Sequence, residues 1–325
     1  MKYTYLGRSG LKVSRLCLGT MNFGVDTEEK EAFKIMDAAL DAGINFFDTA
    51  NIYGWGENAG RTEEIIGRWF AQGGGRRERT VLATKFHGDM HDETDGPNRE
   101  SGLSAYKLRR HLEGSLKRLQ TDHIELYQMH HVDRNVSWDE LWNGFQVAQN
   151  QGKIGYVGAS NFAGWDLAVA QGEAKARGIL GLVSEQHKYN LLCRLPELEV
   201  LPAAQGLGIG VIPWSPLDGG LLAGNLNRGG AGKRSGDRAR ADKHAAQLTA
   251  YAALCDELGE REDVVSLAWL LANPAVTAPI IGVRTLEQFE RSLRVVDVEL
   301  DASTLARIDE IFPGPGGDAP RAYAW

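Results

Sequence analysis

Short apolar runs alternate with longer amphipathic segments along most of this chain. Eight of the runs have the length of a β-strand, and several are nearly continuous in apolar residues, which is typical of parallel strands covered on both faces. These runs lie at residues 15–19, 44–48, 80–85, 124–128, 154–160, 182–186, 209–215 and 278–283. The pattern predicts parallel strands that are separated by helices.

The segments between the runs have the periodicity of helices. In residues 103–120 leucines recur every three or four positions along one stripe. In residues 28–43 the apolar positions share a face, and Gly43 follows where a C-terminal glycine cap belongs. Further helices are expected at residues 61–71, 138–151, 164–177, 197–205, 247–258, 263–273, 286–296 and 301–311.

Eight strands that alternate with helices predict an α/β fold, the (β/α)8 TIM barrel. The N-terminus predicts a β-hairpin ahead of the barrel, because the runs YTYL and VSRLCL flank the turn-rich GRSG. The last helix and the tail after it extend the barrel at the C-terminus. Barrels of this class commonly reach about 250 residues or more as one unit, so we expect a single domain over residues 1–325.

An open doubly wound sheet is the structural alternative. That fold usually places a glycine-rich phosphate turn after its first strand. Here the corresponding stretch, GTMNFG, lacks the G-x-G-x-x-G spacing. The GLGIG stretch at residues 206–210 precedes a strand instead of opening a helix, so we interpret it as a helix exit with tight packing.

Composition narrows the class of protein. The 325 residues carry a formal net charge of −7 with acids and bases interleaved, which argues against nucleic acid as a partner. The three cysteines form no C-x-x-C pair, so neither a disulfide framework nor a zinc knuckle is indicated. No run approaches the roughly 18 apolar residues of a membrane span, and we expect a soluble cytoplasmic protein without a membrane partner.

Candidate chemistry gathers where the predicted strands end, which is where barrels carry their catalytic residues. Asp48 ends the second strand, Lys85 the third, and His130 follows the fourth, while Tyr53 lies on the loop after Asp48. Neighbouring strands are about 4.8 Å apart, so Asp48 and Lys85 are expected to pair. A cation beside Tyr53 lowers its pKa, and this would let the phenol donate a proton to a developing alkoxide while His130 orients the carbonyl.

Two other chemistries fit some of these residues. A strand lysine can form a Schiff base, but this needs a lowered amine pKa and the Asp48 carboxylate raises it. The pairs His130-His131 and His87-x-x-x-His91 are possible metal ligands. Adjacent histidines on a strand point to opposite faces, and the second pair lies in a polar loop, so no metal is expected.

The chain resembles the aldo-keto reductases, NAD(P)H-dependent carbonyl reductases built on a (β/α)8 barrel. The resemblance extends over essentially the whole chain and rests on INFFDTANIYG, VLATK, ELYQMH, VGASNF, EQHKYN, PWSPL and IGVRTLEQF. It implies a catalytic tetrad of Asp48, Tyr53, Lys85 and His130. In the family the tyrosine is the general acid, and hydride passes from nicotinamide C4 to the carbonyl carbon.

The resemblance also implies a set of cofactor contacts. Ser160, Asn161 and Gln186 match residues that bind the nicotinamide carboxamide, and Trp214 matches an aromatic that stacks on its ring. Loop and phosphate contacts, together with Asp48, complete the expected set: Thr20, Met21, Ser215, Leu217, Gly219, Gly282, Arg284 and Gln288. Residues 217–244 resemble a segment that folds over bound cofactor, and Arg234 within it is expected to reach phosphate.

Arg284 favours NADPH over NADH as the cofactor, because a guanidinium suits a 2′-phosphate. The chain departs from the family at Arg291 and Ser292, where relatives often carry Glu-Asn toward the adenine. This departure bears on the adenine contacts and on cofactor preference.

The expected function is reduction of an aldehyde or ketone to the alcohol. Trp55, Phe86 and His131 are the expected walls of the substrate pocket, with Met21, Asn22 and the tail PRAYAW as further candidates. The alternative is an NADPH-binding partner subunit like the potassium-channel β subunits, a similar group that forms tetramers; a homo-oligomer is therefore possible here too. Those proteins have Asn where this chain has His130, which favours an independent enzyme.

Overall fold

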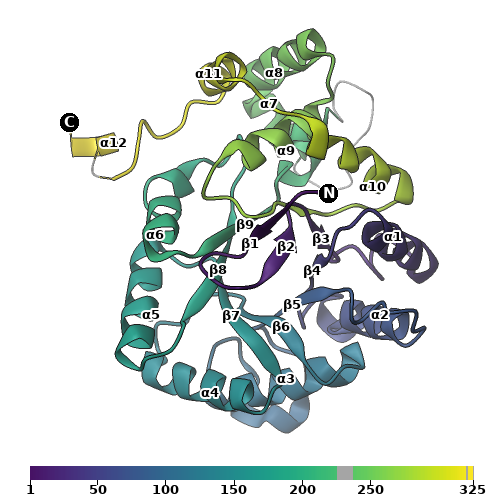
Figure 1. The fold of residues 1–325 in the computed structure, drawn as a ribbon, viewed down its shortest axis with the longest axis vertical. Helices are drawn as coiled ribbons and strands as arrows, with labels where there is room; N and C mark the ends of the chain where they lie inside the picture. Colours follow the sequence, from purple (N-terminus) through teal and green to yellow (C-terminus); the bar gives the residue numbers. More distant parts are fainter. Residues whose placement is uncertain (225–236, 320, 325) are drawn as a thin grey trace.

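The computed structural model describes residues 1–224, 237–319 and 321–324, and its centre is a parallel sheet of eight strands in the order β10-β3-β4-β5-β6-β7-β8-β9 (Figure 1). All eight predicted strands are present. Their bounds are β3 Cys17–Gly19, β4 Phe46–Asp48, β5 Val81–Phe86, β6 Ile124–Met129, β7 Ile154–Ser160, β8 Leu182–Lys188, β9 Gly210–Trp214 and β10 Ile280–Ile281.

The sheet curls on itself so that its first and last strands meet. Val211 of β9 donates its N–H to the carbonyl of Ala275 at 3.2 Å and accepts from the N–H of Thr277 at 2.8 Å, just before β10. β10 in turn pairs with β3. The fold is therefore the expected (β/α)8 TIM barrel and not an open doubly wound sheet.

Helices surround the barrel, as the view down its axis shows (Figure 1). Several begin at side-chain caps: Ser104, Ser137 and Thr285 each accept from a backbone N–H three residues later. The helices are α1 Glu29–Asp41, α2 Arg61–Phe70, α3 Ala105–Leu119, α4 Trp138–Asn150, α5 Gly164–Ala176, α6 Val200–Leu207, α7 Asp237–Lys243, α8 Ala245–Leu258, α9 Glu262–Ala272, α10 Leu286–Ser292, α11 Ala302–Ile311 and α12 Arg321–Ala324.

Short 3-10 helices fill several connections: η1 Gly56–Asn58, η2 Glu93–Arg99, η3 Leu195–Glu197, η4 Asp218–Ala223 and η5 Leu293–Asp297. Two predictions change accordingly. The helix expected at 286–296 is divided into α10 and η5. No helix was expected within residues 217–244, but the described part of this segment contains η4 and the whole of α7.

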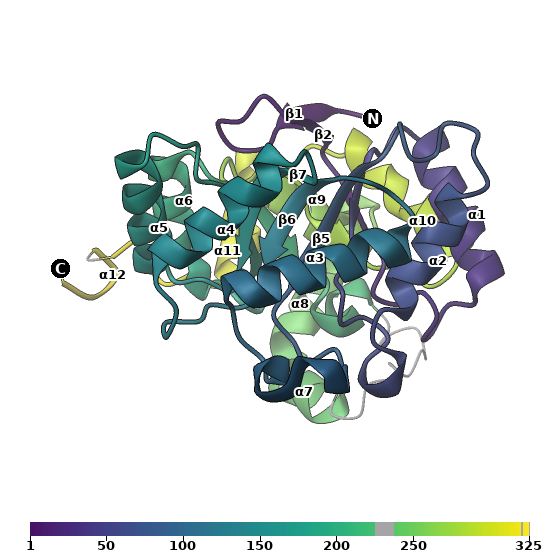
Figure 2. The ribbon, with the colours of Figure 1, turned by 90° about the horizontal axis from the view of Figure 1, so that it is seen from below.

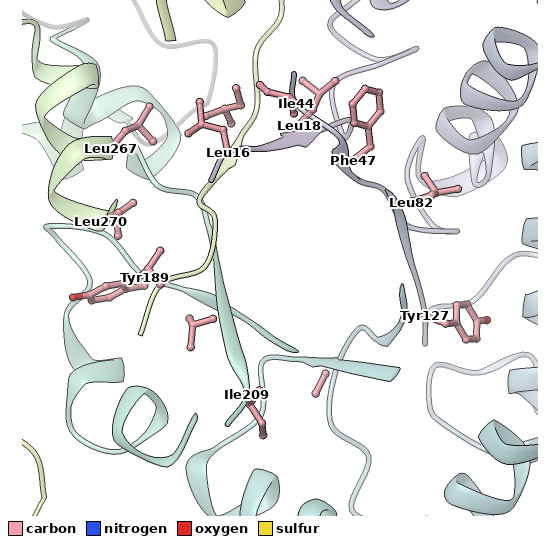
Figure 3. Close-up of a cluster of buried hydrophobic side chains, with 14 of the residues drawn as sticks. Leu16, Leu18, Ile44, Phe47, Leu82, Tyr127, Tyr189, Ile209, Leu267 and Leu270 are labelled. Atoms are coloured by element: carbon pink, nitrogen blue, oxygen red, sulfur yellow. The ribbon is translucent and has the colours of Figure 1, made fainter. Parts of the chain in front are cut away.

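Successive residues of each strand face opposite sides of the barrel wall. Phe47, Leu82 and Tyr127 point outward into the layer between strands and helices, where they join the larger apolar core (Figure 3). The residues before them, among them Phe46 and Leu126, face inward and form a smaller core inside the barrel. This alternation follows from the two-residue period of a strand.

The N-terminal hairpin, β1 Tyr3–Tyr5 and β2 Lys12–Ser14, closes one end of the barrel (Figures 1 and 2). Gly7 packs so closely there that an added Cβ would lie 2.5 Å from the carbonyl oxygen of Gly208, and Gly208 ends α6 with φ +73°. The GLGIG stretch is therefore a helix exit with tight packing, as expected. α7 lies at the opposite end, where the strands terminate (Figure 2).

The C-terminal tail lies at the periphery. Ala319 donates its N–H to the carbonyl of Leu198 at 2.8 Å, and α12 lies beyond α6, away from the barrel axis (Figure 1). The described part of the tail therefore does not wall the substrate pocket, contrary to expectation. In the part of the chain that the structure describes, no helix combines the length and apolar character needed to cross a membrane.

Candidate active site

Asp48 and Lys85 form a buried ion pair inside the mouth of the barrel. Lys85 Nζ lies 2.7 Å from Asp48 Oδ2, and both side chains are almost fully buried. The pairing expected from the sequence is therefore present. The strands are staggered, however, so Asp48 is paired in register with Ala83, and the lysine side chain reaches back toward the carboxylate from one repeat further along β5.

The ammonium of Lys85 uses all three of its N–H bonds. It donates to Asp48, to the backbone carbonyl of Thr49 at 2.7 Å and to the hydroxyl oxygen of Tyr53 at 3.1 Å. An ammonium has no acceptor, so the Tyr53 oxygen accepts in this contact. The hydroxyl hydrogen of Tyr53 remains available for another partner.

Burial and charge set the protonation of this pair. Burial lowers the pKa of Lys85, but Asp48 and Tyr53 together outweigh burial, and the pKa lies above its usual value. Burial raises the pKa of Tyr53, and Lys85 only partly opposes this. Lys85 thus lowers the pKa of the phenol as expected, but the pKa still lies above its usual value, because desolvation of the phenolate is the larger effect. Lys85 is charged and Tyr53 is protonated at neutral pH.

His130 lies at the edge of Tyr53, with ring centroids 5.9 Å apart and planes at 81°. Burial, together with the charge of Lys85, lowers the pKa of His130 to about 2. The imidazole is therefore neutral over the physiological range, and it can offer a hydrogen bond without adding a positive charge. The four residues expected as a tetrad are all brought together.

Two amides complete the environment of Asp48. Gln186 Nε2 donates to Asp48 Oδ1 at 2.8 Å, and Gln128 Nε2 donates to the same oxygen at 3.2 Å. Gln186 was expected to contact the cofactor, and in the structure its amide is bonded to the Asp48 carboxylate. Gln128 was not expected; its polar side chain at the end of an apolar strand was the available signal.

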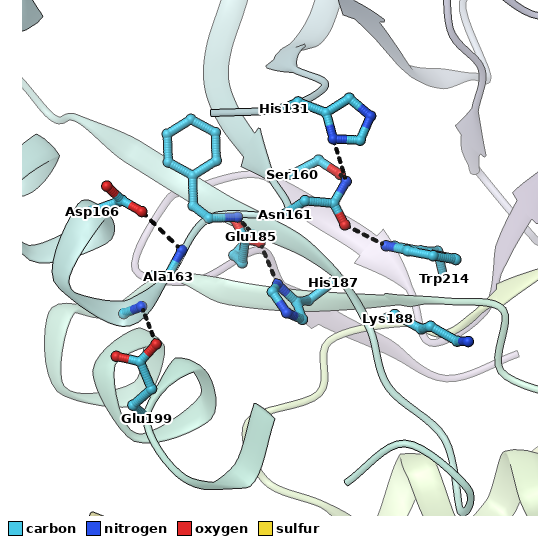
Figure 4. Close-up of polar contacts among 12 residues, drawn as sticks. His131, Ser160, Asn161, Ala163, Asp166, Glu185, His187, Lys188, Glu199 and Trp214 are labelled. Atoms are coloured by element: carbon cyan, nitrogen blue, oxygen red, sulfur yellow. Dashed lines mark hydrogen bonds and ion pairs between the residues drawn. The ribbon is translucent and has the colours of Figure 1, made fainter. Parts of the chain in front are cut away.

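Ser160, Asn161 and Trp214, at the ends of β7 and β9, form a hydrogen-bonded cluster (Figure 4). Asn161 has φ +62°, and its Nδ2 donates to the hydroxyl of Ser160 and to the carbonyl of His130, each at 3.1 Å. Its Oδ1 accepts from the indole Nε1 of Trp214 at 3.0 Å. Three of the four residues expected around a nicotinamide are therefore linked through Asn161, which also contacts the backbone of His130.

Glu185 holds this turn in place from the other side of β8 (Figure 4). Its Oε1 accepts from the N–H of Phe162 at 3.0 Å and pairs with His187 Nδ1 at 2.9 Å. Burial raises the pKa of Glu185 above its usual value. Its sequence signal is a carboxylate within an otherwise buried strand.

The segment after β9 presents its backbone in an unusual way. Ser215 and Asp218 have φ of +51° and +47°, and Gly219 and Gly220 also have positive φ. The N–H of Asp218 donates within the turn to the carbonyl of Ser215 at 3.0 Å. Leu217 lies within this segment and accepts from the N–H of Gly220 at 2.9 Å.

Asp218 is buried and ties this segment to two cations that the sequence did not indicate. Its carboxylate lies 3.2 Å from Lys188 Nζ and also contacts the guanidinium of Arg240 on α7. Lys188 lies over the ring of Trp214, 5.9 Å from its centroid. Arg234, expected to reach phosphate, lies outside the described residues.

The first loop and the end of the barrel meet at the expected adenosine side. Thr20 Oγ1 donates to the carbonyl of Asp48 at 2.9 Å, and the partly exposed Met21 follows it. Asn22 Nδ2 donates to the carbonyl of Gly282 at 3.3 Å. These contacts join the loop after β3 to the segment after β10.

Arg284 has its backbone fixed, while its side chain has no partner among the described residues. Its N–H donates to Gln288 Oε1 at 2.9 Å, and its carbonyl accepts from Thr27 Oγ1 at 3.0 Å. No hydrogen bond or ion pair joins its guanidinium to the residues that the structure describes. Arg291, where the chain departs from the family pattern, pairs instead with Asp263 at 3.1 Å.

These residues fit a nicotinamide dinucleotide cofactor. The indole face of Trp214 suits the nicotinamide ring, and the Ser160 hydroxyl and the Asn161 amide beside it suit its carboxamide. The guanidinium of Arg284, to which no residue in the described part of the chain is bonded, suits a phosphate. A mixture of aromatic, amide and anion-binding groups of this kind matches the parts of that cofactor.

Two of the three expected pocket walls lie at the mouth. Trp55 is 45% exposed, and its ring centroid is 5.7 Å from that of Tyr53. His131 is exposed and stacks on His130 at 5.0 Å with planes at 9°. Phe86 is not a pocket wall: it is fully buried and stacks on Tyr127 at 4.9 Å in the layer outside the barrel.

Histidines also gather at the mouth without forming a metal centre. The ring of His87 meets that of His131 at 5.2 Å, edge to face. His91 lies near Asp89 instead. Over residues 1–224, 237–319 and 321–324, no group of three or more His, Cys, Asp or Glu side chains is arranged to hold a metal ion.

Comparison with known proteins agrees with this geometry. A profile of the Aldo/keto reductase family matches residues 15–312. The "Uncharacterized oxidoreductase YrpG" of Bacillus subtilis is 63% identical over 326 residues, covering 100% of both chains. A "Probable voltage-gated potassium channel subunit beta" of Arabidopsis thaliana is 33% identical over 311 residues, covering 92% of each. The versiconal hemiacetal acetate reductase of Aspergillus parasiticus is 29% identical over 339 residues, covering 96% of this chain and 97% of its own.

Proposed function

This chain belongs to the aldo/keto reductase family of oxidoreductases, and we propose that it reduces an aldehyde or ketone to the alcohol with NADPH. The observation that carries the proposal is the contact of Lys85 with Tyr53 at 3.1 Å. Because the lysine can only donate, the phenol is left with a free O–H directed to another acceptor. A substrate carbonyl oxygen is the acceptor that this chemistry requires.

Tyr53 acts as the general acid in the proposed reaction. NADPH held by Trp214, Ser160 and Asn161 would, when bound, supply the hydride that the carbonyl carbon receives. As negative charge develops on the carbonyl oxygen, the Tyr53 proton moves to that oxygen and a phenolate remains on the enzyme. The Lys85 ammonium stabilises this phenolate, and a proton from solvent later restores the phenol.

Asp48 and His130 support this step in different ways. Asp48 keeps Lys85 charged inside the barrel, and the two glutamine amides hold the carboxylate in position. His130, neutral with a pKa of about 2, can orient the carbonyl beside Tyr53 without competing with the phenol as a proton source.

We propose NADPH as the preferred cofactor because Arg284 has a guanidinium without a partner among the described residues. A 2′-phosphate offers that group a charge-assisted hydrogen bond, and the hydroxyl of NADH does not. The preference for NADPH rests on this side chain together with the backbone bonds that fix its position.

Tyr53→Phe tests the assignment of the acid. Removing the hydroxyl keeps the ring and its packing, so NADPH affinity, measured by fluorescence titration, is expected to change less than about threefold. Turnover of a simple aldehyde, followed by NADPH absorbance, is expected to fall by about 10²–10⁴-fold, the usual contribution of a general acid. Retained turnover in this variant would refute the mechanism.

A second candidate function is that of an NADPH-binding partner subunit with little turnover. The Arabidopsis relative at 33% identity carries a channel-subunit name, which is the reason to consider it. His130 favours the enzyme, because it places a neutral imidazole beside the expected acid. Tight NADPH binding without oxidation by any of a broad panel of aldehydes and ketones would favour the partner role.

A further inference from the structure

The exposed side of α5 is apolar, unlike that of a typical surface helix. On α2, for comparison, the exposed positions are Arg61, Glu64 and Arg68. On α5 an exposed stripe follows positions three or four residues apart: Trp165, Ala168, Val169, Gly172 and Ala176. Trp165 is 55% exposed and Val169 is 41% exposed. The opposite side of α5 packs on the barrel through further apolar residues, so the helix has the pattern of one that is covered on both sides.

The indole of Trp165 is held in place by Arg134. The guanidinium lies over the indole ring, 4.9 Å from its centroid. It also binds the buried carboxylate of Asp166 through two bonds, from Nε to Oδ1 at 3.1 Å and from Nη2 to Oδ2 at 2.7 Å. Tryptophan and arginine are enriched among the residues that dominate the energy of protein interfaces, and here both are ordered before any partner binds.

Gly172 leaves an open place two turns after Trp165 on the same side of α5. A Cβ added to Gly172 would meet no heavy atom within 4 Å, and the residue has no positive φ. Neither packing within the chain nor backbone conformation therefore requires glycine here, although glycine destabilises the interior of a helix. A helical glycine of this kind suits a place that another chain approaches closely.

The stripe is complementary to itself when two copies of α5 pack antiparallel about a two-fold axis. An axis halfway between Trp165 and Gly172 passes between residues 168 and 169. It places each Trp165 over the partner's Gly172, and each Ala168 beside the partner's Val169. A large side chain then meets a position that has none, at both ends of the contact. A parallel pair would instead bring the two tryptophans against each other.

The charges beside the stripe are complementary in the same arrangement. Asp166 and Glu173 are seven residues apart and therefore lie on one edge of α5. Arg134 binds Asp166, so its guanidinium lies on that edge at the N-terminal end of the helix. Glu173 lies near the other end, exposed and without an ion pair to the residues that the structure describes. Antiparallel two-fold packing brings like edges together with their ends reversed, and each Arg134 then meets the partner's Glu173.

We propose that two copies of this chain form a symmetric dimer in which their α5 helices pack antiparallel across a two-fold axis. α5 lies on the flank of the barrel, on another side from α2 (Figure 1). A specific interface covers roughly 800 Å² on each partner, which is more than one helix face provides. The apolar surface continues past α5: Arg177 at its end donates to Asn143 of α4 at 2.8 Å, and Val147, one turn further along α4, is 56% exposed. The dimer does not depend on carbonyl reduction.

The first test is analytical ultracentrifugation of the full-length chain at about 1–100 µM, where we expect a reversible equilibrium of monomer and dimer. Trp165→Ala should raise the dimer Kd by about 30-fold or more, because it removes the large side chain at both ends of the contact. Glu64→Leu, on the exposed side of α2, is the control and should change Kd by less than about twofold. A chain that stays monomeric, or an oligomer that Trp165→Ala leaves unchanged, would overturn the proposal.

Gly172→Leu separates docking from folding. Leucine is the better helix former and has open space within its own chain, so the urea midpoint should be equal or higher at a concentration where parent and variant are both monomeric. The same side chain occupies the place that the partner's Trp165 covers, so the dimer Kd should rise by about tenfold or more. An unchanged Kd in this variant would overturn the proposed packing.

Cysteine cross-linking locates the axis. In Ala168→Cys the two thiols lie beside the axis on facing helices, and mild oxidation should join two chains by a disulfide. Lys175→Cys is the control on the same helix, because the two copies of this position are about 20 Å apart along the helices at a rise of about 1.5 Å per residue. The parent protein serves as the blank, since Cys17 and Cys255 are buried. Equal cross-linking of the two variants, or none in Ala168→Cys, would overturn the proposal.

Discussion

Two consecutive residues of β5, Lys85 and Phe86, lie on opposite faces of the strand and have different roles. Lys85 points into the barrel mouth, where its ammonium has three polar partners. Phe86 points into the layer between barrel and helices, where it stacks on Tyr127 and meets Phe145 edge to face. Neither residue is exposed. The degree of burial therefore does not tell a residue of the site from a residue of the core. The side of the strand on which the residue lies does.

The difference teaches what each face tolerates. Inside the mouth the side chains form a polar network in which each charge depends on a named partner, so loss of one member leaves another unsatisfied. In the outer layer the contacts are apolar and many, so the energy depends on filled volume. Substitutions at the mouth should therefore lower turnover, whereas substitutions in the outer layer should lower only the free energy of unfolding.

Lys85→Met is expected to have the largest effect. It removes the cation that stabilises the Tyr53 phenolate, and turnover should fall by about 10²–10⁴-fold. It also leaves the Asp48 carboxylate buried without its ion pair, which should lower the free energy of unfolding by about 3–5 kcal/mol. Turnover measured by NADPH absorbance and unfolding measured in urea give the two values.

The double variant Lys85→Met with Asp48→Asn serves as its control. Without a charge to leave unpaired, most of the lost stability should return, while turnover should stay as low as in the single variant. If turnover recovered together with stability, the Lys85 ammonium would not be needed for catalysis.

Phe86→Ala should affect the opposite property. Removing a buried aromatic from the outer layer is expected to lower the free energy of unfolding by about 3–5 kcal/mol. The relative kcat/KM values across a panel of aldehydes should stay within about twofold of the parent protein, and Phe86→Leu should lose less stability. A changed substrate ranking would restore Phe86 as a pocket wall.

Much of the fold followed from local pattern. The eight strands could be predicted because short, nearly continuous apolar runs are typical of buried parallel strands. The helices could be predicted because their apolar residues recur with a helical period. Among the segments missed, η2 and α7 are polar and have no apolar stripe that would mark them, and η4 is too short to show a period. Helix ends shifted by a few residues, because capping side chains and not periodicity decide where a helix begins.

From the sequence, the site could be predicted only for residues that lie within a recognisable motif. Asp48, Tyr53, Lys85 and His130 lie in motifs at strand ends, and all four meet. Gln128 reaches Asp48 through the stagger of the strands, which no local pattern shows. The assignment of Phe86 to the pocket was an avoidable error, since it follows the inward-facing Lys85 and must point to the other side of the wall.

At the rim of the mouth, Arg284→Ala should weaken NADPH binding by about 10- to 100-fold, since a charge-assisted bond is worth about 1.5–3 kcal/mol. NADH affinity should change less than about threefold. Fluorescence titration with both cofactors measures the difference. Arg291→Ala is the matched control, because its guanidinium pairs with Asp263, and it should keep most of the NADPH preference. Equal losses for the two cofactors in Arg284→Ala would refute the phosphate role.

The smallest effect concerns His111, a buried histidine of the outer layer whose Nδ1 lies 2.9 Å from Asn51 Nδ2. Burial, with nearby cations, lowers its pKa to about 3. An unfolded histidine titrates near pH 6.5, so between pH 6.5 and about 3 only the unfolded chain binds this proton, and stability falls as pH falls. His111→Gln should therefore reduce the pH slope of the unfolding free energy between pH 6 and 4 by up to about 1.4 kcal/mol per unit. Urea denaturation across pH measures this slope, which between pH 7 and 8 should match that of the parent protein; an identical slope at acid pH would show that the folded protein protonates His111 freely.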